Sequence, residues 1–374
     1  MTLGEILMDK SRDAVVFMAP AVRAGIGEFL GRADFADLAR KSVTALKTLG
    51  FSKVFDMSFS ADITTLEETT ELLLRIRDGG PLPQFTSCCP GWFKIAETRH
   101  PELAGHLSTT KSPQAIFGSL LREFYKPVEG RELAIVSLVP CVVKKIEAER
   151  ADLWATPERR DVDAVFTTKE FADMAAAAGL DIAALPETPF DEFGESGSGV
   201  IYGSTGGVAS AIVRTALAAL RGGFDGVDLS PMRSPDDVKK IEIPINDAGA
   251  VPEIMRGRFA DFGFMRGRTL RAAIVHSVPA IERVAKSVAE GGEFAGFDFI
   301  EFMMCPGGCV GGAGQKKNDA AGTAIRRAQV LGGAEAASAV KSPLSNPALL
   351  EFYGARLPDG PCSREAARLF HRKP

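Results

Sequence analysis

The stretch "LAIVSLVPC" (133–141) decides the fold that we expect for this chain. Residues 133–139 form a short apolar run, which is typical of a strand buried inside a parallel sheet. The run leads directly into Pro140 and Cys141, so a reactive side chain stands where the strand ends. In open α/β sheets, ligands bind outside the carboxyl ends of the strands. This stretch therefore indicates an α/β protein whose functional site lies at strand ends.

Further strand-like runs alternate with helix-like segments along the chain. We expect strands at 13–18, 52–59, 83–87, 162–168, 270–277 and 297–304, and helices at 61–80, at 111–124 and after the glycine-rich turn at 194–207. Thr64 and Glu67 have the spacing of a capping box for the helix at 61–80, and a glycine pair ends that helix. Ser112 precedes Pro113 as an N-cap precedes a first-turn proline. The alternation predicts an α/β fold with two lobes of mainly parallel, twisted sheet flanked by helices.

Several of the expected strands end at unusual residues. We expect these strand ends to converge on one pocket: Pro20, Cys88 with Cys89, Cys141 and Cys305. The charged segment 149–161 is loop-like. It suggests approximate lobes at 1–155 and 156–345, with a C-terminal helical segment at 346–374, within one domain spanning 1–374.

The composition is that of an ordinary globular protein, with 374 residues, 45% hydrophobic and 25% charged. A net charge of −4 gives no indication of a nucleic-acid or membrane-surface binder. The first residues, "MTLGEILMDKSRDAVVF", do not resemble a signal peptide, and the apolar runs are too short to span a bilayer. We therefore expect a cytoplasmic protein without nucleic-acid or membrane partners.

Six cysteines occur, and in a reducing cytosol clustered cysteines favour metal binding or catalysis over disulfides. "TSCCPGW" (86–92) places two of them side by side, where a disulfide across one peptide bond would be badly strained. "CPGGC" (305–309) holds two more around glycines that permit the tight backbone wrapping of an iron–sulfur site. With Cys141 and one of the adjacent pair, four thiolates are available, which is the ligand count of a 4Fe–4S cluster. A Cys₄ zinc site and unliganded buried cysteines remain alternatives, and Cys362 is interpreted as a spare thiol.

Three segments resemble the signatures of iron-only (FeFe) hydrogenases: "TSCCPGW", "PCVVKKIE" (140–147) and "EFMMCPGGCVGGAGQ" (301–315). The similarity extends from "MAPAVRAGIGEF" (18–29) to "NPALLEFYGARL" (346–357). It implies a minimal catalytic domain without accessory iron–sulfur domains. It also implies an H-cluster, a 4Fe–4S cluster linked to a two-iron unit with CO, cyanide and azadithiolate, buried in the cleft between the lobes. The implied activity is the reversible interconversion of protons plus electrons and molecular hydrogen.

The resemblance assigns roles to individual residues. It implies that the 4Fe–4S cluster is held by Cys89, Cys141, Cys305 and Cys309, and that Cys309 also bridges to the two-iron unit. Cys88 stays unliganded and serves as the acid/base beside the iron. The implied proton relay runs from Cys88 to solvent through Glu68, Ser108 and Glu71, with Arg75 near the exit. On residue type alone, the three helix residues of this relay would be a charged surface face.

The remaining pocket residues follow from the same resemblance. Lys144 is implied to donate hydrogen bonds to a cyanide ligand, and Pro20, Gln114 and Met303 to line the two-iron unit. Ser198, between Gly197 and Gly199, is expected to offer backbone amides to the same ligands. Outside the motif, Lys144 would be a solvated lysine and Met303 a core methionine.

The sequence also departs from the family pattern. Val139 stands where a methionine is usual, Met304 replaces a common alanine, and "GGAGQKK" (311–317) replaces the usual Gly-Gly-Gly-Gln-Pro. These changes keep open a low-activity hydrogen sensor, and a non-enzymatic iron–sulfur cluster assembly protein is a third interpretation. The retained Cys88, Glu68 and Glu71 favour the enzyme. Implied partners are hydrogenase maturation enzymes and a ferredoxin-like electron carrier, for which Lys316 and Lys317 are a candidate docking patch.

Overall fold

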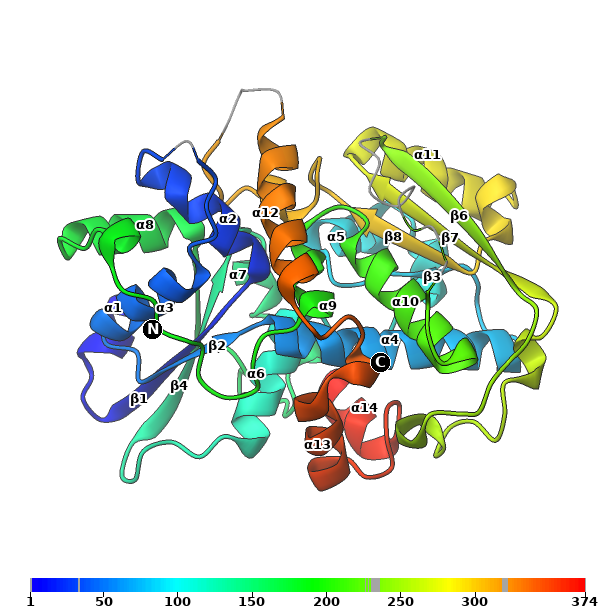
Figure 1. The fold of residues 1–374 in the computed structure, drawn as a ribbon, viewed down its shortest axis with the longest axis horizontal. Coiled ribbons are helices and arrows are strands. Elements are labelled where there is room, and N and C mark those ends of the chain that lie inside the picture. The colour runs from blue at the N-terminus through cyan, green and yellow to red at the C-terminus, as the bar shows by residue number, and fades with distance from the viewer. Residues whose placement is uncertain are drawn as a thin grey trace.

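The computed structural model describes residues 2–32, 34–225, 227, 229, 236–317 and 322–373. Two four-stranded sheets lie side by side, with helices packed around them (Figure 1). The α/β class with mainly parallel sheets is confirmed. The first sheet is entirely parallel and has the strand order β2-β1-β4-β5. Its strands are β1 (Arg12–Met18), β2 (Lys53–Asp56), β4 (Glu132–Val139) and β5 (Ala164–Thr167).

The second sheet has the order β3-β8-β7-β6. Its strands are β3 (Gln84–Phe85), β6 (Val238–Ile245), β7 (Arg268–His276) and β8 (Phe299–Met303). Only β6 in this sheet runs antiparallel to its neighbour. The sequence did not predict β6, because its side chains alternate between buried and exposed and so form no continuous apolar run.

The two sheets are not separated by a single boundary in the sequence near residue 155, because each contains strands from the other side of it. Strand β3 joins the second sheet although it precedes β4 and β5, which belong to the first. The helices that surround both sheets are α1 (Leu3–Met8), α2 (Pro20–Phe29), α3 (Ala39–Thr48), α4 (Ser58–Asp78), α5 (Pro90–Arg99), α6 (Pro113–Phe124), α7 (Lys144–Glu147), α8 (Thr168–Ala177), α9 (Gly197–Val200), α10 (Gly207–Arg221), α11 (Val278–Ala289), α12 (Thr323–Ala337), α13 (Pro347–Arg356) and α14 (Arg364–Phe370).

Helix α4 begins earlier than the sequence predicted. The strand expected at 52–59 ends at Asp56, whose carboxylate accepts a 2.8 Å hydrogen bond from the Ser58 amide at the start of the helix. Thr64 therefore lies inside the helix, where its hydroxyl donates to the Ser60 carbonyl at 3.0 Å. The capping box expected at Thr64 is wrong, because Asp56 supplies the acceptor that the helix start needs. The predicted glycine stop is confirmed by Gly79, whose φ of 73° is the left-handed conformation of a C-cap.

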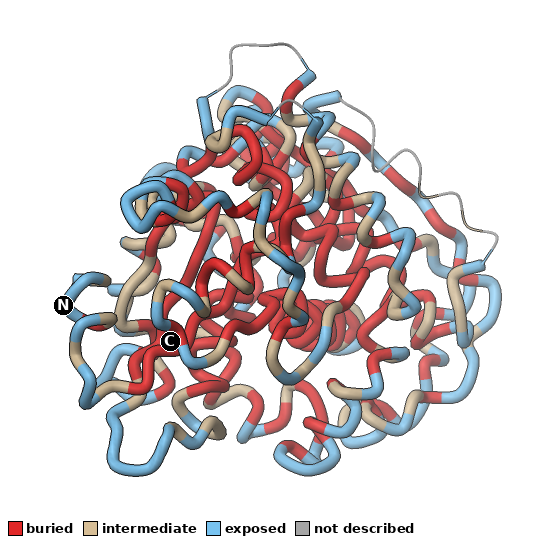
Figure 2. Tube along the Cα trace, turned by 60° about the vertical axis from the view of Figure 1, so that its left-hand side comes forward, coloured by how far each residue is buried: buried red, intermediate tan, exposed pale blue. Residues whose placement is uncertain are grey.

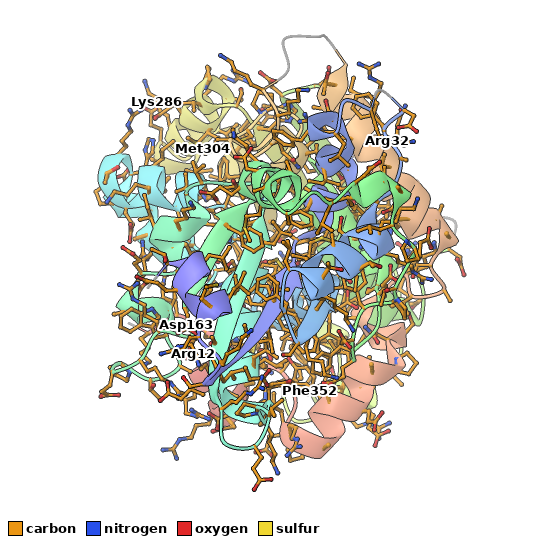
Figure 3. All side chains as sticks on the ribbon, turned by 90° about the vertical axis from the view of Figure 1, so that its left-hand side faces the viewer. Arg12, Arg32, Asp163, Lys286, Met304 and Phe352 are labelled. Atoms are coloured by element: carbon orange, nitrogen blue, oxygen red, sulfur yellow. The ribbon has the colours of Figure 1, made fainter. Side chains whose placement is uncertain are left out.

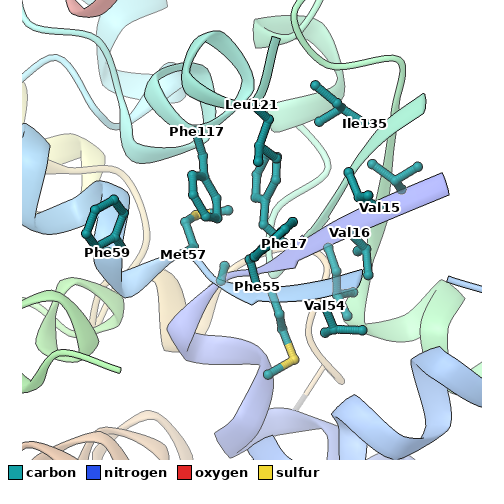
Figure 4. Packing of buried hydrophobic residues seen from close by; sticks show 14 of the residues in the cluster. Val15, Val16, Phe17, Val54, Phe55, Met57, Phe59, Phe117, Leu121 and Ile135 are labelled. Carbon is teal, nitrogen blue, oxygen red and sulfur yellow. The ribbon is translucent and has the colours of Figure 1, made fainter. Parts of the chain in front are cut away.

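The central segments of the chain are buried, and exposed residues lie mainly on the outer loops and helix faces (Figure 2). Around the first sheet, Phe17 and Phe55 both contact the ring of Phe117 on α6, with centroid separations of 5.0 and 5.7 Å (Figure 4). Truncating such a buried ring to alanine typically costs about 3–5 kcal/mol. This aromatic core fixes α6 against β1, so the carboxyl ends of β1 and β4 and the start of α6 have a rigid support.

Many charged side chains lie on the surface, together with a few exposed apolar ones such as Met8 and Ile146. Lys286, whose side chain is 70% exposed, projects from α11 (Figure 3). None of the helices within the described ranges combines the length and apolar character that a bilayer-crossing helix needs.

Candidate active site

Strand ends from both sheets line one cavity of about 260 Å³. The first sheet contributes Pro20, which follows β1, and Pro140 with Cys141, which follow β4. From the second sheet come Cys88 and Cys89, beyond β3, and the segment that follows β8. The predicted convergence of strand ends on one pocket is therefore confirmed.

The backbone around "CPGGC" turns both of its cysteines toward this cavity. Gly307 and Gly308 have backbone φ angles of 79° and 86°, which residues other than glycine rarely adopt. A Cβ at Gly308 would lie 2.5 Å from the Thr205 amide nitrogen, so only glycine fits this close approach. The loop then returns over Cys141, since a Cβ at Gly314 would lie 2.9 Å from the Cys141 nitrogen.

Four cysteines are neighbours in this cavity. Burial raises the pKa of Cys305 to about 12, and the charges of Cys89 and Cys141 add to the effect. Burial also raises the pKa of Cys309, and the same two cysteines together with Cys305 contribute. Four thiolates held this close in a buried site repel one another unless a cationic group neutralises them. The donor set therefore fits a 4Fe–4S cluster, whose irons bind four thiolates.

Cys88 is the fifth thiol of the cavity. It is 9% exposed and lies next to the Cys89 N-cap of α5. Burial raises the pKa of Cys88 well above its usual value, and the neighbouring Glu68 carboxyl raises it further, whereas Lys144 lowers it. A thiol with such a pKa keeps its proton and can hydrogen-bond to a basic atom in the cavity.

The Glu68 carboxyl is the next acidic group on α4. It is 1% exposed, and no described residue forms a hydrogen bond with its Oε1 atom. Burial raises the pKa of Glu68 well above the usual value, and the charge of Glu71 raises it further. Both effects favour the protonated form of Glu68, which can donate its proton.

Glu71, one turn along α4, has the opposite character. Burial alone would raise its pKa, but Arg75, His371 and hydrogen bonds from Ser108 and the Thr109 amide outweigh burial and hold it below its usual value. The Ser108 hydroxyl donates to Glu71 at 2.7 Å, and the Arg75 guanidinium donates to the same carboxylate at 2.7 Å. The pKa values of two carboxyls near the Ser108 hydroxyl are thus shifted in opposite directions, that of Glu68 upward and that of Glu71 downward, which suits a stepwise transfer of protons.

Arg75 is held in place by backbone carbonyls. Its guanidinium donates to the carbonyl oxygens of Pro81, Gly105, His106 and Leu107, at 2.9 to 3.2 Å. The Arg75 side chain is 11% exposed. The structure therefore joins Ser108 and Arg75 directly to Glu71, with Glu68 one turn earlier on the same helix, and a proton relay through these residues stays a prediction.

Lys144 reaches the cavity from α7 and is tied to two partners. Its ammonium donates to the Cys88 carbonyl at 3.1 Å and to the two Glu147 oxygens at 2.8 and 2.7 Å. Burial alone would lower the pKa of Lys144, but the charge of Glu147 outweighs burial and raises it, so the ammonium stays charged. Gln114 lies beside this pair, where its amide donates to the Lys144 carbonyl at 3.0 Å.

Two further expected pocket residues, Pro20 and Met303, line the cavity, but Ser198 does not. Ser198 lies instead near Asp62 of α4 and helps to lower the pKa of that carboxyl. The amides of Gly197 and Gly199 are bonded to the hydroxyls of Ser338 and Ser196. The glycine-rich turn therefore does not present these two amides to the cavity.

Glu147 is the site residue that sequence reasoning missed. It is 4% exposed and accepts hydrogen bonds from Lys144, Ser112 and Gln114. Its position three residues after Lys144, on the same short helix face, was a usable signal.

Comparisons with known proteins point to one family. Residues 12–313 match the family model described as "Iron only hydrogenase large subunit, C-terminal domain". The chain is 38% identical over 310 residues to iron hydrogenase 1 of Clostridium pasteurianum, covering 81% of this chain and 50% of that protein. It is 37% identical to the periplasmic [Fe] hydrogenase large subunit of Nitratidesulfovibrio vulgaris, covering 83% of this chain and 70% of that protein.

A solved structure supports the same relationship. The apo [FeFe]-hydrogenase HydA1 from Chlamydomonas reinhardtii superimposes with a TM-score of 0.82 at 32% identity, covering 98% of this chain and 95% of that one. A more distant similarity, 29% identity covering 97% of this chain and 74% of the relative, links it to cytosolic iron-sulfur assembly component 3 of Mus musculus. The chain spans only half to about 61% of the length of the first two curated relatives.

Proposed function

Because the chain belongs to the iron-only hydrogenase family, we propose that it is an FeFe hydrogenase that interconverts protons plus electrons and molecular hydrogen. The observation that carries the proposal is the row from Cys88 through Glu68 and Ser108 to Glu71, which begins at the cysteine-lined cavity. Cluster binding alone would not require buried acid groups arranged for proton transfer.

In this proposal the four cysteines Cys89, Cys141, Cys305 and Cys309 hold a 4Fe–4S cluster, to which a two-iron unit with CO, cyanide and azadithiolate is attached. When bound, this cofactor supplies the redox chemistry and the site of hydrogen formation or cleavage. Lys144, Gln114, Pro20 and Met303 line the part of the cavity that remains. Lys144 supplies a fixed positive charge for an anionic ligand, because Glu147 keeps the ammonium protonated and oriented.

The proton path follows the row of acids on α4. Cys88 delivers a proton to the cavity from its Sγ atom, and the protonated Glu68 replaces it. Ser108 passes the next proton by accepting at Oγ from protonated Glu71 and donating its own hydroxyl proton to Glu68, after which the hydroxyl turns back to its 2.7 Å bond with Glu71. Glu71 is reloaded from solvent beside Arg75, whose fixed guanidinium keeps the carboxylate ionised between transfers. The reverse order removes protons during hydrogen oxidation.

Electrons must come from a separate carrier, and we propose a ferredoxin-like protein. Lys316, expected at its docking patch, donates to the Glu28 carbonyl at 2.8 Å, so its ammonium is held against α2. The two-iron unit also requires the action of hydrogenase maturation enzymes. A role in iron–sulfur cluster assembly is the second candidate. It rests on the 29% identity to the assembly component and on no feature of the site.

One experiment separates these candidates. Protein matured with the complete cofactor is examined for infrared bands in the CO and cyanide region and for hydrogen production with reduced methyl viologen. The hydrogenase proposal predicts both the bands and turnover. Protein that binds the cubane but shows neither result would instead support the assembly role.

A further inference from the structure

A second group of metal-binding side chains lies along the relay helix α4, beginning one turn before Glu71 and outside the cysteine-lined cavity. Glu67 of α4, Cys362 before α14 and His371 after α14 each offer one ligand atom, and these atoms lie within 4.8 Å of one another. His371 Nε2 is 3.0 Å from Glu67 Oε2 and 3.9 Å from Cys362 Sγ. We propose that these three residues form a metal site for a borderline divalent cation such as Zn²⁺, separate from the cysteine-lined cavity.

The donor types fit this cation. Zinc binds cysteine sulfur, histidine nitrogen and carboxylate oxygen, and sites with three protein ligands keep a fourth position for water. One thiolate and one carboxylate cancel the charge of a divalent ion, and a neutral imidazole completes the set. The result is an uncharged centre, which a buried location tolerates far better than an isolated charge. Glu67 is 0% exposed and His371 9% exposed.

The groups around these ligands are arranged as metal sites require. The second ring nitrogen of His371, Nδ1, is 2.8 Å from the Thr109 hydroxyl, which fixes the ring and leaves Nε2 facing the other two ligands. The second carboxylate oxygen of Glu67, Oε1, accepts a hydrogen bond from the Tyr353 hydroxyl. Partners of this kind orient metal-bound histidines and carboxylates, and their loss typically weakens binding about 10- to 100-fold.

Without a metal, the Cys362 thiol is only a weak hydrogen-bond donor to the Glu67 backbone carbonyl. Its contact with the Glu67 carbonyl is 3.4 Å, and the 3.9 Å separation from His371 is long for any strong hydrogen bond. Cys362 also has a φ of 52°, a left-handed conformation that normally favours glycine. Its backbone amide donates to Glu67 Oε2 at 2.6 Å, and its Sγ atom lies within 4.8 Å of the ligand atoms of Glu67 and His371.

The site would join distant parts of the chain. Cys362 and His371 bracket helix α14, and Glu67 belongs to α4, so one ion would tie both ends of α14 to the relay helix. Helix α13 also packs on α4, and α14 packs on α6 (Figure 1). His371 further forms a β-bridge with Thr110, next to the Ser108 loop.

The test uses protein whose 4Fe–4S cluster is already in place, so that the four cavity cysteines are not available to the added metal. Zn²⁺ alone is added, and metal content is measured after equilibrium dialysis. We expect one zinc per chain in addition to unchanged iron. The zinc X-ray absorption spectrum should show one sulfur at about 2.3 Å and nitrogen or oxygen neighbours at about 2.0 Å.

Variants locate the site. Cys362→Ser and His371→Gln should each weaken zinc binding at least about tenfold, and Thr109→Val should weaken it about tenfold through the histidine. His106→Gln is the matched control, because the His106 ring bonds the Pro83 carbonyl at 2.9 Å and stacks on Phe85, and it is not one of the three proposed ligands. Equal unfolding temperatures of the iron-loaded, zinc-free variants and of wild type in the same state show that folding is intact.

Two results would overturn the site. The first is that the iron-loaded wild type retains no zinc, which would mean that Glu67, Cys362 and His371 only hydrogen-bond to one another. The second is zinc binding that lacks a sulfur neighbour and is unchanged in both the Cys362 and the His371 variants. Neither result depends on hydrogenase activity, so the zinc site and the proposed function are tested independently.

Discussion

The Ser108 hydroxyl donates a 2.7 Å hydrogen bond to the Glu71 carboxylate, although 37 positions separate the two residues in sequence. The loop that carries Ser108 also directs the Thr109 amide at both Glu71 oxygens, at 3.0 and 3.1 Å. The carboxylate is therefore ionised and fixed in position before any proton reaches it. This arrangement makes the relay testable one group at a time.

Replacing Ser108 by alanine should lower turnover by about 10²-fold or more, because the only hydroxyl between Glu68 and Glu71 in the proposed path is lost. Hydrogen production with methyl viologen measures the effect, and the infrared bands of the cofactor should not change. Ser119→Ala is the control, since Ser119 is a buried serine that bonds Asp161 instead. Full activity in Ser108→Ala would rule out this path.

Cys88→Ala should retain the iron but lose nearly all turnover. The thiol is the last proton donor before the cavity, and alanine has no acidic proton. Iron analysis and methyl viologen assays measure the two properties. The neighbouring Ser87→Ala is the control, because the Ser87 hydroxyl donates to the Thr110 carbonyl. Loss of iron in Cys88→Ala would show that Cys88 is a ligand instead.

Cys305→Ser should reduce the iron bound per chain well below the about four atoms of one cubane. Serine is a much poorer iron ligand than a thiolate, and the other three cysteines cannot close the cluster without it. Cys362→Ser, outside the cavity, should keep its iron. Unchanged iron in Cys305→Ser, or zinc in place of iron in the wild type, would contradict the cluster assignment.

Glu147→Gln should disturb the cofactor through Lys144, which would lose its charged partner while keeping its position on α7. We expect a shift of the cyanide infrared bands and lower turnover, with iron content unchanged. Lys145→Gln is the control, because Lys145 pairs with Glu170 on the surface. Identical infrared bands in Glu147→Gln and wild type would show that Glu147 has no part in orienting Lys144.

Asp62→Asn should stabilise the protein at high pH. Burial raises the pKa of Asp62 to about 7, so the folded state binds a proton that the unfolded state has released. The wild type therefore loses stability as pH rises from about 4 to 7, whereas the variant lacks this loss.

Asparagine at position 62 keeps an oxygen that accepts the 2.8 Å hydrogen bond from Asn346. Above pH 7 we expect the variant to gain about 2–4 kcal/mol of unfolding free energy, as measured by urea denaturation. A stability difference that does not change with pH would contradict the raised pKa.

Much of the candidate site was visible in the sequence. The apolar run at 133–139 predicted β4, and the cysteines at strand ends predicted one pocket, because chemistry and backbone direction are both local properties. The motifs predicted the family, which the comparisons confirm. The alternating strand β6 was missed, since an edge strand with one solvated face leaves a weaker pattern.

The reactive residues and the strands that deliver them could be read from the order of amino acids alone, but which groups meet depends on how the chain packs. Packing removed Ser198 from the cavity and brought Ser112 and Gln114 to Glu147. It also joined Cys362 to Glu67 and His371, across 295 and 9 positions. Such contacts escape sequence patterns because burial and long-range packing fix them. The pKa values of Glu68 and Glu71, neighbours on one helix, likewise shift in opposite directions, because Arg75 and the Ser108 loop outweigh the effect of burial at Glu71 but not at Glu68.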